Sequence, residues 1–320
     1  MSELGEHAGS RLSPMVSVIM PAYNAAAWLP RTLASLAAQD YSAPRYELIL
    51  VDDGSTDNTA DVARRFAASW SGTMRVLTKA NGGPGSARNW GVADSQAEVI
   101  AFIDADCAAA PDWLRSLVTP LAESDAAGIG GAIVGASPMG WVATYLEATG
   151  LYRQRVRHGQ VDYLLTGNAA FRRAALQAVD GFKEHAWAED ADLSFRLRAA
   201  GYSLLVTQQG RVVHYGAPTT MRALARELYR YGCGSYWQSR HWPHGRQPAH
   251  ELVRHAGAIV LSLGLALRLT PRVGWWAALR YWPLVVVEHG AFCWGILTAR
   301  WGHTRPQEAT LARVSDEMSG

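Results

Sequence analysis

The chain has 320 residues, 49% of them hydrophobic, which is enough for one large α/β domain with an appendage or for two modest domains. Its net charge is only +2, so no general attraction to nucleic acid is expected. The three cysteines lack paired spacing, which argues against a disulfide framework or a thiolate zinc site and favours a reducing, cytosolic setting. Residues 1–14 have no apolar core segment, so we expect a disordered leader and no secretory signal peptide.

From residue 16 onward the chain repeats a strand, a loop and a helix. Residues 16–20 form the first expected strand, residues 47–53 the second and residues 74–78 the third, and a run with helical periodicity follows each of them. Strands that alternate with helices in this way indicate right-handed βαβ crossovers and a doubly wound sheet.

The fourth expected strand, residues 99–103, is apolar throughout and ends in two carboxylates. Asp104 and Asp106 are two positions apart, so alternation along an extended chain puts both on the same side. Neighbouring carboxylates repel each other unless a cation, a sugar hydroxyl or a hydrogen-bond donor lies between them. Open α/β sheets bind ligands at the carboxyl ends of their strands, so this edge is the candidate site.

Other polar residues also follow the ends of the expected strands. Taken singly, Asn24, Ser55 and Asp57 are most simply explained as turn or helix-cap residues. Their convergence with the carboxylates nevertheless favours a binding site. A nicotinamide oxidoreductase with a dinucleotide-binding domain is an alternative, but no Gly-x-Gly-x-x-Gly follows the first strand.

Several motifs, in order along the chain, resemble those of the family 2 glycosyltransferases of the GT-A fold. The motifs are Pro21-Ala-Tyr-Asn24, Val51-Asp-Asp-Gly-Ser-Thr-Asp57, Gly85-Ser-Ala-Arg-Asn89, Asp104-Ala-Asp106, Gly167-Asn168, Gly181-Phe182, and the stretch from Glu189 to Arg196, followed by His214. The resemblance covers about two thirds of the chain. It implies an α/β fold, a Rossmann-like mixed sheet flanked by helices, over residues 15–220.

The resemblance also implies a site for a nucleotide-sugar donor. Asp53 would accept a hydrogen bond from the base, Asp104 would hold the ribose or the sugar, and Arg88 would add positive charge near the diphosphate. An alternative for Arg88 is a helix-surface arginine paired with Asp94 or Glu98. The implied donor-binding residues are Pro21, Tyr23, Asn24, Asp53, Asn81, Arg88, Asp104, Ala105 and Asp106.

A divalent cation, Mg2+ or Mn2+, is the cofactor that the resemblance implies. Asp106 would bind it and share it with the diphosphate. His214 follows a short strand-like run and is the second implied ligand, since imidazole suits Mn2+ better than Mg2+. A structural role for this histidine is the alternative.

The implied catalytic residues open a helix at position 189. Asp190 would be the general base that takes the proton of the acceptor hydroxyl, and Glu189 is the rival base. The alternative for Glu189 is favourable charge at a helix N-terminus. Trp187 and Asn168 are the expected acceptor-binding residues, with a core position as the alternative for Trp187.

From residue 221 onward the chain is rich in arginine and tryptophan. It has two apolar stretches, 256–267 and 273–298. The first is shorter than the roughly 20 residues that span a bilayer. The second is interrupted by Arg280, Pro283, Glu288 and His289. We expect residues 221–303 to form a C-terminal helical segment associated with the membrane, in the interface or as a re-entrant hairpin, and residues 304–320 to form a flexible tail. A soluble helical subdomain is the alternative.

The expected function is transfer of one sugar, with inversion, from a nucleotide-sugar to a hydroxyl of a glycan or lipid-linked acceptor at the cytoplasmic face of the cell membrane. Processive members of the family carry Gln-x-x-Arg-Trp, whereas this chain has His241 in place of that arginine, which favours single-sugar transfer. The alternative function is that of a non-catalytic, nucleotide-sugar-binding scaffold in a membrane glycan-assembly complex.

Overall fold

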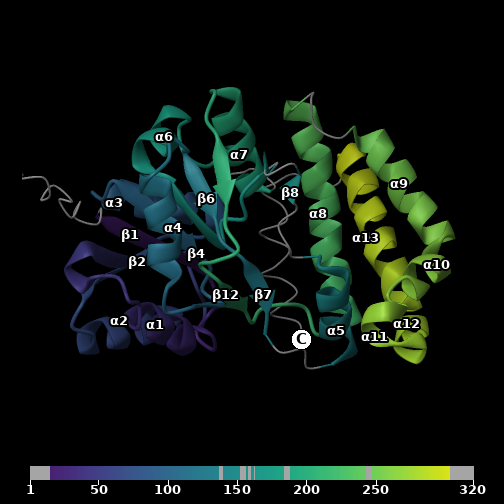
Figure 1. Ribbon diagram of the computed structural model, residues 1–320, viewed down its shortest axis with the longest axis horizontal. Coiled ribbons are helices and arrows are strands. Elements are labelled where there is room, and N and C mark those ends of the chain that lie inside the picture. Colours follow the sequence, from purple (N-terminus) through teal and green to yellow (C-terminus); the bar gives the residue numbers. More distant parts are fainter. Residues whose placement is uncertain are drawn as a thin grey trace, which may run out of the picture.

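The computed structural model describes residues 15–136, 140–151, 156–157, 160–161, 163–183, 188–242 and 247–302. In Figure 1 a unit built on a twisted sheet lies beside a unit of helices, with α8 as the helix nearest to the sheet. The expected leader and tail lie outside the described residues.

The main sheet has seven strands among the described residues, in the order β11-β6-β10-β4-β1-β2-β3. Strands β1, β2, β3 and β4 are parallel, and β10 pairs antiparallel with both β4 and β6. The predicted α/β fold with a mixed sheet is therefore confirmed. The bounds are β1 Val16–Ala22, β2 Tyr46–Asp52, β3 Thr73–Thr78, β4 Val99–Ile103, β6 Gly128–Gly130, β10 Asn168–Arg172 and β11 Leu204–Val206.

Helices cover the sheet on both faces, and each central strand contributes to two cores. Val18 packs with Leu33 of α1 in one core, while the next residue, Ile19, packs with Leu193 of α7 in the other. Because side chains alternate along a strand, a strand buried on both faces is apolar throughout. The helices are α1 Leu29–Ala37, α2 Thr59–Ser69, α3 Gly83–Asp94, α4 Trp113–Ala122, α6 Arg173–Ala178 and α7 Glu189–Ala199, with a 3-10 turn at Ala43–Arg45.

A small second sheet lies at the carboxyl end of β4. Its strands are β5 Cys107–Ala109, β12 Val212–His214 and β7 Ile133–Gly135, with β12 in the middle. The antiparallel register between β12 and β5 pairs His214 with Cys107. A histidine from late in the chain is thus carried to the two carboxylates that follow β4. Strands β8 Val156–Arg157 and β9 Gln160–Val161 form a separate pair.

The helical unit begins with α8 at Met221, the first residue of the predicted second domain. The hydroxyl of Thr220 caps this helix by accepting a hydrogen bond from the amide of Ala223. An earlier helix, α5, also belongs to the unit, because its buried Tyr145 packs in one cluster with Leu224 and Leu284. The helices are α5 Trp141–Thr149, α8 Met221–His241, α9 Pro248–Val260, α10 Ser262–Leu267, α11 Thr270–Val273, α12 Trp275–Arg280 and α13 Trp282–Arg300.

Two glycines allow α8 and α13 to approach closely. A Cβ atom on Gly232 would lie 2.1 Å from the backbone oxygen of Phe292, and one on Gly295 would lie 2.1 Å from that of Tyr229. Real Cβ atoms do not come so near to backbone, so both positions require glycine at this helix separation. The buried Cys233 and Ile296 pack beside this crossing.

Within the described part of the chain, one helical stretch is long and apolar enough to cross a membrane. It runs from Trp275 to Arg300, has a mean hydropathy of 1.2 in its apolar window, and has 39% of that window buried. A core helix of a soluble protein can have the same length and composition. The packing around α13 therefore has to be used to distinguish a membrane span from a core helix.

Candidate active site

Arg88 lies at the centre of the polar edge of the sheet. It projects from α3, is 4% exposed, and donates hydrogen bonds from Nη1 to Glu189 Oε1 (2.7 Å) and from Nη2 to Asp104 Oδ1 (2.9 Å). Burial opposes its charge, but the two carboxylates outweigh burial and raise the pKa of Arg88. The helix-surface interpretation of Arg88 is therefore wrong, and Asp94 pairs instead with Arg75.

Two carboxylates follow β4, as the sequence predicts, and each has its own cationic partner. Burial raises the pKa of Asp104, and the charge of Arg88 offsets this only in part. Asp106 contacts His214, with 3.2 Å between Oδ2 and Nε2. Burial acts against the charge of both members of this second pair, yet the contact lowers the pKa of Asp106 and raises that of His214.

The Asp106–His214 pair has the donor set of a divalent metal site. The ligand atoms of Asp106, Cys107 and His214 all lie within 4.8 Å of one another. A Cβ atom on Gly216 would lie 1.8 Å from Asp106 Oδ2, so the lack of a side chain there leaves room for the carboxylate. Burial raises the pKa of the Cys107 thiol well above its usual value, which makes it a poor ligand. Carboxylate and imidazole together fit Mn2+.

Asp190 stands in the first turn of α7. Its Oδ1 accepts a hydrogen bond from the amide of Ala191 (2.7 Å). Burial and the neighbouring charge of Glu189 raise the pKa of Asp190 to about 7. A carboxylate with this pKa can take up a proton near neutral pH. Glu189 is instead held by Arg88, so the two candidate bases differ in environment.

Helix α8 closes this side of the site with contacts that the sequence did not predict. Gln238 Nε2 donates to the backbone oxygen of Ala188 (3.3 Å), and Trp242 Nε1 donates to Asp192 Oδ1 (3.1 Å). Ala188, in the left-handed conformation (φ 54°), is the residue just before α7. The residues of the degenerate Gln-x-x-x-Trp motif therefore hold the start of the helix that carries Asp190.

Glu227 and Tyr231 form a second unpredicted pair on α8. The Tyr231 hydroxyl donates to Glu227 Oε1 at 2.7 Å. The pKa of the Tyr231 hydroxyl is raised, first by desolvation and then by the charge of Glu227. The charge of Asp190 adds a weaker effect in the same direction. Glu227 also contributes, after Asp106, to the raised pKa of His214. The pair therefore lies within electrostatic reach of the candidate base and of the candidate metal ligands. Its only sequence signal is the four-residue spacing on one helix face.

The loop before α3 is organised by Asp53. This residue is 3% exposed. Its Oδ1 accepts hydrogen bonds from Lys79 Nζ (2.8 Å) and from the amide of Gly82 (3.0 Å). Its Oδ2 accepts a hydrogen bond from the amide of Gly83 (2.7 Å). Asn81 Nδ2 donates to the backbone oxygen of the same aspartate (2.9 Å). These contacts order the glycine-rich loop, while the predicted hydrogen bond from a nucleobase to Asp53 stays a prediction.

Asn24 and Asp57 link the first two loops. Asn24 has φ 49°, its Oδ1 accepts a hydrogen bond from the amide of Thr56 (2.9 Å), and its amide donates to Ser55 Oγ (2.9 Å). Asp57 accepts hydrogen bonds from the amides of Thr59 (2.9 Å) and Ala26 (3.1 Å). These contacts agree with the turn and cap interpretation. The nearby Pro21 and Tyr23 are half-buried at the end of β1.

Three other predicted site residues have different outcomes. Asn168 is fully buried: its Nδ2 donates to the backbone oxygens of Ala132 and Gly210 (both 2.9 Å), and its Oδ1 accepts from Trp113 Nε1 (2.7 Å). This geometry does not support the predicted acceptor contact. Ala105 is also buried, and its backbone oxygen accepts a hydrogen bond from Thr32. Trp187 lies outside the described residues.

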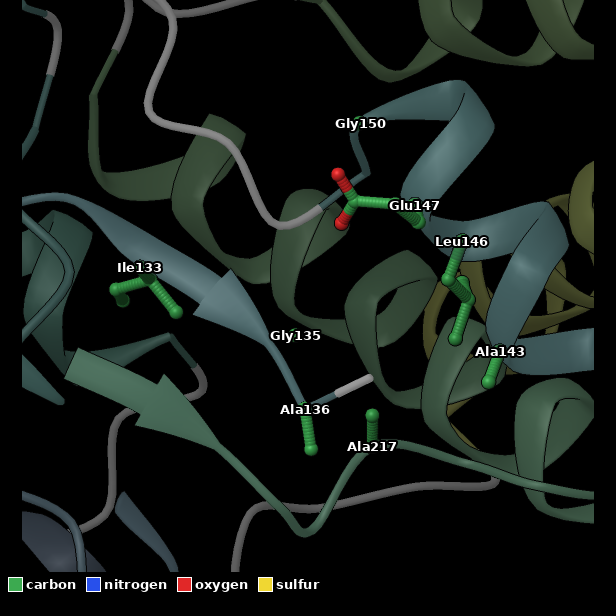
Figure 2. A pocket seen from close by; sticks show the side chains of 8 residues that line it. All are labelled: Ile133, Gly135, Ala136, Ala143, Leu146, Glu147, Gly150 and Ala217. Carbon is green, nitrogen blue, oxygen red and sulfur yellow. The ribbon is translucent and has the colours of Figure 1, made fainter. Parts of the chain in front are cut away.

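A small pocket lies between β7 and α5, beside the strand that carries His214. Figure 2 shows Glu147 reaching from α5 into the space in front of β7. The amide of Ala136 in the pocket wall donates to the backbone oxygen of His214 (3.0 Å). The pocket thus lies where the sheet unit meets the helical unit. Its lining is largely apolar and consists of Ile133, Gly135, Ala136, Ala143, Leu146, Glu147, Gly150 and Ala217.

Comparison with known proteins accounts for this combination of sheet, carboxylates and histidine. The family model for glycosyl transferase family 2 matches residues 17–180, and that for glycosyl transferase family group 2 matches residues 99–298. The chain belongs to glycosyl transferase family 2. It is a family 2 glycosyltransferase, an enzyme that transfers a sugar from a nucleotide-sugar donor.

Two relatives and one solved structure are similar to this chain over more than two thirds of its length. Glycosyltransferase AglE of Haloferax volcanii is 28% identical over 69% of this chain and 73% of its own length. The beta-monoglucosyldiacylglycerol synthase of Nostoc sp. is 30% identical over 70% of this chain but only 49% of its own length. The mannosyltransferase PcManGT of Pyrobaculum calidifontis, solved in complex with GDP-Man and Mn2+, has a TM-score of 0.70 at 19% identity, covering 92% of this chain and 89% of that one. The last comparison shows that the GT-A fold is shared.

Proposed function

We propose that the enzyme transfers one sugar, with inversion, from a nucleotide-sugar to a hydroxyl of a glycan or lipid-linked acceptor, and that Asp190 is the general base. The observation that carries the proposal is the place of Asp190 in the first turn of α7, next to the Glu189 that Arg88 holds and in one cluster with Asp104 and the Asp106–His214 pair; burial and the charge of Glu189 raise its pKa there. An ordinary aspartate is too weak a base for a hydroxyl at neutral pH, whereas a pKa near 7 improves the match.

The reaction makes and breaks one bond at the same carbon. The acceptor oxygen forms a bond to the anomeric carbon while its proton passes to Asp190. The bond from that carbon to the diphosphate breaks, and the departing diphosphate takes the electron pair. Attack from the side opposite to the leaving group inverts the anomeric centre. Glu189 is the weaker candidate for the base, because its carboxylate is engaged by Arg88.

The leaving diphosphate needs positive charge next to it. Asp106 and His214 would hold Mn2+ or Mg2+, and the ion would act there as a Lewis acid. Arg88 adds a fixed guanidinium held by Asp104. The similar fold of PcManGT, a mannosyltransferase solved in complex with GDP-Man and Mn2+, supports such a cofactor.

Donor binding is placed at the loops that follow β1, β2 and β3. Pro21, Tyr23, Asn24, Asp53 and Asn81 would line it, and the bonds from the Gly82 and Gly83 amides to Asp53 would keep the loop in place. We place the acceptor side between α7 and α8, where the Glu227–Tyr231 pair lies within electrostatic reach of Asp190, instead of at the buried Asn168.

The acceptor would be met at the cytoplasmic face of the cell membrane. This location is supported by the apolar stretch from Trp275 to Arg300 and by similarity to a relative whose name denotes a glucosyl-diacylglycerol, which is a lipid. The helical unit would be attached to the membrane peripherally or by insertion of its C-terminal part. It would then bring the site to a membrane-embedded substrate.

The test is a thermal-shift experiment with UDP-, GDP- and dTDP-sugars, with and without Mn2+. We expect one nucleotide class to raise the melting temperature in the presence of Mn2+. The shift should disappear with EDTA and in Asp106→Ala. No shift with any nucleotide under any metal condition would contradict the donor site. A shift that persists fully in Asp106→Ala would contradict the assigned metal ligand.

A further inference from the structure

The outer end of the helical unit exposes a concentration of large apolar side chains. We call this region the tip and define it as residues 260–282, which include α10, α11 and α12. In Figure 1 it lies on the side of the helical unit away from the sheet. Val260 and Trp276 are each 84% exposed. The other exposed apolar residues of the tip are Leu261, Leu263, Trp275, Leu279 and Trp282.

The charge of the tip has only one sign. The sequence between Glu251 and Glu288 contains no Asp or Glu, but it contains Arg254, Arg268, Arg272 and Arg280. The last three arginines are exposed on the tip. Tryptophan and arginine together fit the headgroup region of a bilayer, where the apolar part of each side chain enters and its polar end stays hydrated.

The packing of α13 argues against a span across the bilayer. On one side, the glycine crossing brings its backbone against α8. Elsewhere on α13, Glu288 accepts a hydrogen bond from Tyr145 of α5, and His289 Nδ1 lies 2.9 Å from His255 Nδ1 of α9. A spanning α13 would have to give up these neighbours, and its glutamate and histidine would enter hydrocarbon.

We infer that the tip inserts into the interface of an anionic phospholipid bilayer while α13 stays packed between its neighbours, so that the chain lies on one leaflet without crossing it. The inference rests on the proposed membrane location and deepens it by naming the inserting surface and the lipid charge. The exposed Arg268 and Arg280, with no acidic residue in the tip, favour anionic headgroups, while Arg272 also donates to the backbone oxygen of Ala148. The tryptophans supply the apolar contact.

The experiment measures binding of the full chain to vesicles by co-sedimentation. Vesicles of phosphatidylcholine alone are compared with vesicles that also contain phosphatidylglycerol. We expect tight binding only to the anionic vesicles, weakening as salt is raised. W275S/W276S should weaken binding more than tenfold, and R268Q/R280Q by about fivefold for each charge removed.

Matched controls come from the catalytic unit. Trp90 on α3 is 50% exposed and the Arg64 side chain on α2 is 55% exposed, so W90S and R64Q remove the same chemistry elsewhere and should bind like the wild type. Circular dichroism and the melting temperature of each tip variant show whether it is folded. Bound protein should be released by alkaline carbonate, as expected for a chain that does not span.

Three results would overturn the inference: equal binding to neutral and anionic vesicles, wild-type binding by the folded tip variants, or resistance to carbonate extraction. Donor binding is read separately by the thermal shift with nucleotide-sugars. Vesicle binding without donor binding would support the tip assignment and contradict the proposed activity. Donor binding without vesicle binding would contradict the tip assignment and leave the donor site supported.

Discussion

Two clusters of partly or fully buried titratable side chains can be compared within the described part of the chain, and they differ in how many partners their carboxylates have. In the catalytic cluster, four carboxylates (Asp104, Asp106, Glu189 and Asp190) share one guanidinium, from Arg88, and one imidazole, from His214. In the helical cluster, the two carboxylates of Glu251 and Glu288 have among their neighbours Arg254, Tyr145 and the imidazoles of His255 and His289.

This difference separates a ligand site from a structural network. In the helical cluster each carboxylate has a close donor: Arg254 pairs with Glu251, Tyr145 donates to Glu288, and the ring of His255 stacks on Phe292 at 4.0 Å between centroids. Its groups satisfy one another, as buried polar groups in a structural network must. The catalytic cluster keeps surplus negative charge, which attracts a divalent cation and raises the pKa of a base.

The largest expected effect comes from removing the base. Asp190→Asn should lower the transfer rate by about 10²- to 10⁴-fold, because the amide cannot accept the acceptor proton. Steady-state assays of nucleoside diphosphate release measure this, with Asp180→Asn as a control, since the Asp180 side chain is 93% exposed. A non-catalytic scaffold would keep its biological effect in Asp190→Asn.

The wild-type rate should also depend on pH through the same group. Asp190 must be deprotonated to act, and its pKa is raised to about 7. Activity should therefore rise as the pH increases through about 7 and then level off. A profile already flat from pH 5 upward would contradict the assignment.

Metal binding should be the next most sensitive property of the catalytic cluster. Protonated imidazole cannot bind a metal, and the contact with Asp106 raises the pKa of His214, so Mn2+ affinity should fall as the pH is lowered. Calorimetric titration with Mn2+ measures this. His214→Ala should weaken binding by at least tenfold. The exposed His250 provides the control His250→Ala, which should bind Mn2+ like the wild type.

A substitution at the crossing of α8 and α13 should change the stability of the fold without acting directly on the transfer reaction. Gly232→Ala should lower the free energy of unfolding by about 1 to 3 kcal/mol, because the added methyl group meets the backbone of Phe292. Gly257→Ala on α9 is the control, since its Cβ would meet nothing within 4 Å, and it should stabilise by about 0.5 to 1 kcal/mol. Urea denaturation of both variants tests the pair; equal stability changes would argue against the close crossing.

The smallest effect is expected in the helical cluster itself. Glu288→Gln keeps an acceptor for the Tyr145 hydroxyl, so the transfer rate should stay within about twofold of wild type and stability should change by about 1 kcal/mol or less. A large loss of activity with intact folding would show that this cluster is more than structural.

Much of the catalytic cluster could be predicted from the sequence because its residues follow strands. An apolar run such as residues 99–103 can be recognised as a buried strand, and the carboxyl ends of parallel strands share one edge. The positions of Asp104 and Asp106 follow from this argument. The contact of Arg88 with Glu189 does not, because 101 positions separate the two residues and only the tertiary fold joins them.

The errors and omissions have a common physical cause. Periodicity shows which face of a helix is polar, but it does not show which neighbour that face meets. Glu227 and Tyr231 look like an ordinary surface pair in the sequence, and only the tertiary fold brings this exposed pair within electrostatic reach of Asp190 and His214. Asn168 looks like a site residue because it follows Gly167, yet its strand lies inside the sheet and its amide binds backbone there.

The place of α5 has a consequence for how this protein can be divided. The helix precedes the proposed base Asp190 in sequence, but its buried Val142, Tyr145 and Leu146 pack against α8, α10 and α13. A chain cut after Thr220 would keep α5 and expose that apolar face to water. Exchange of the helical unit between relatives therefore has to carry α5 as well or repack its apolar face.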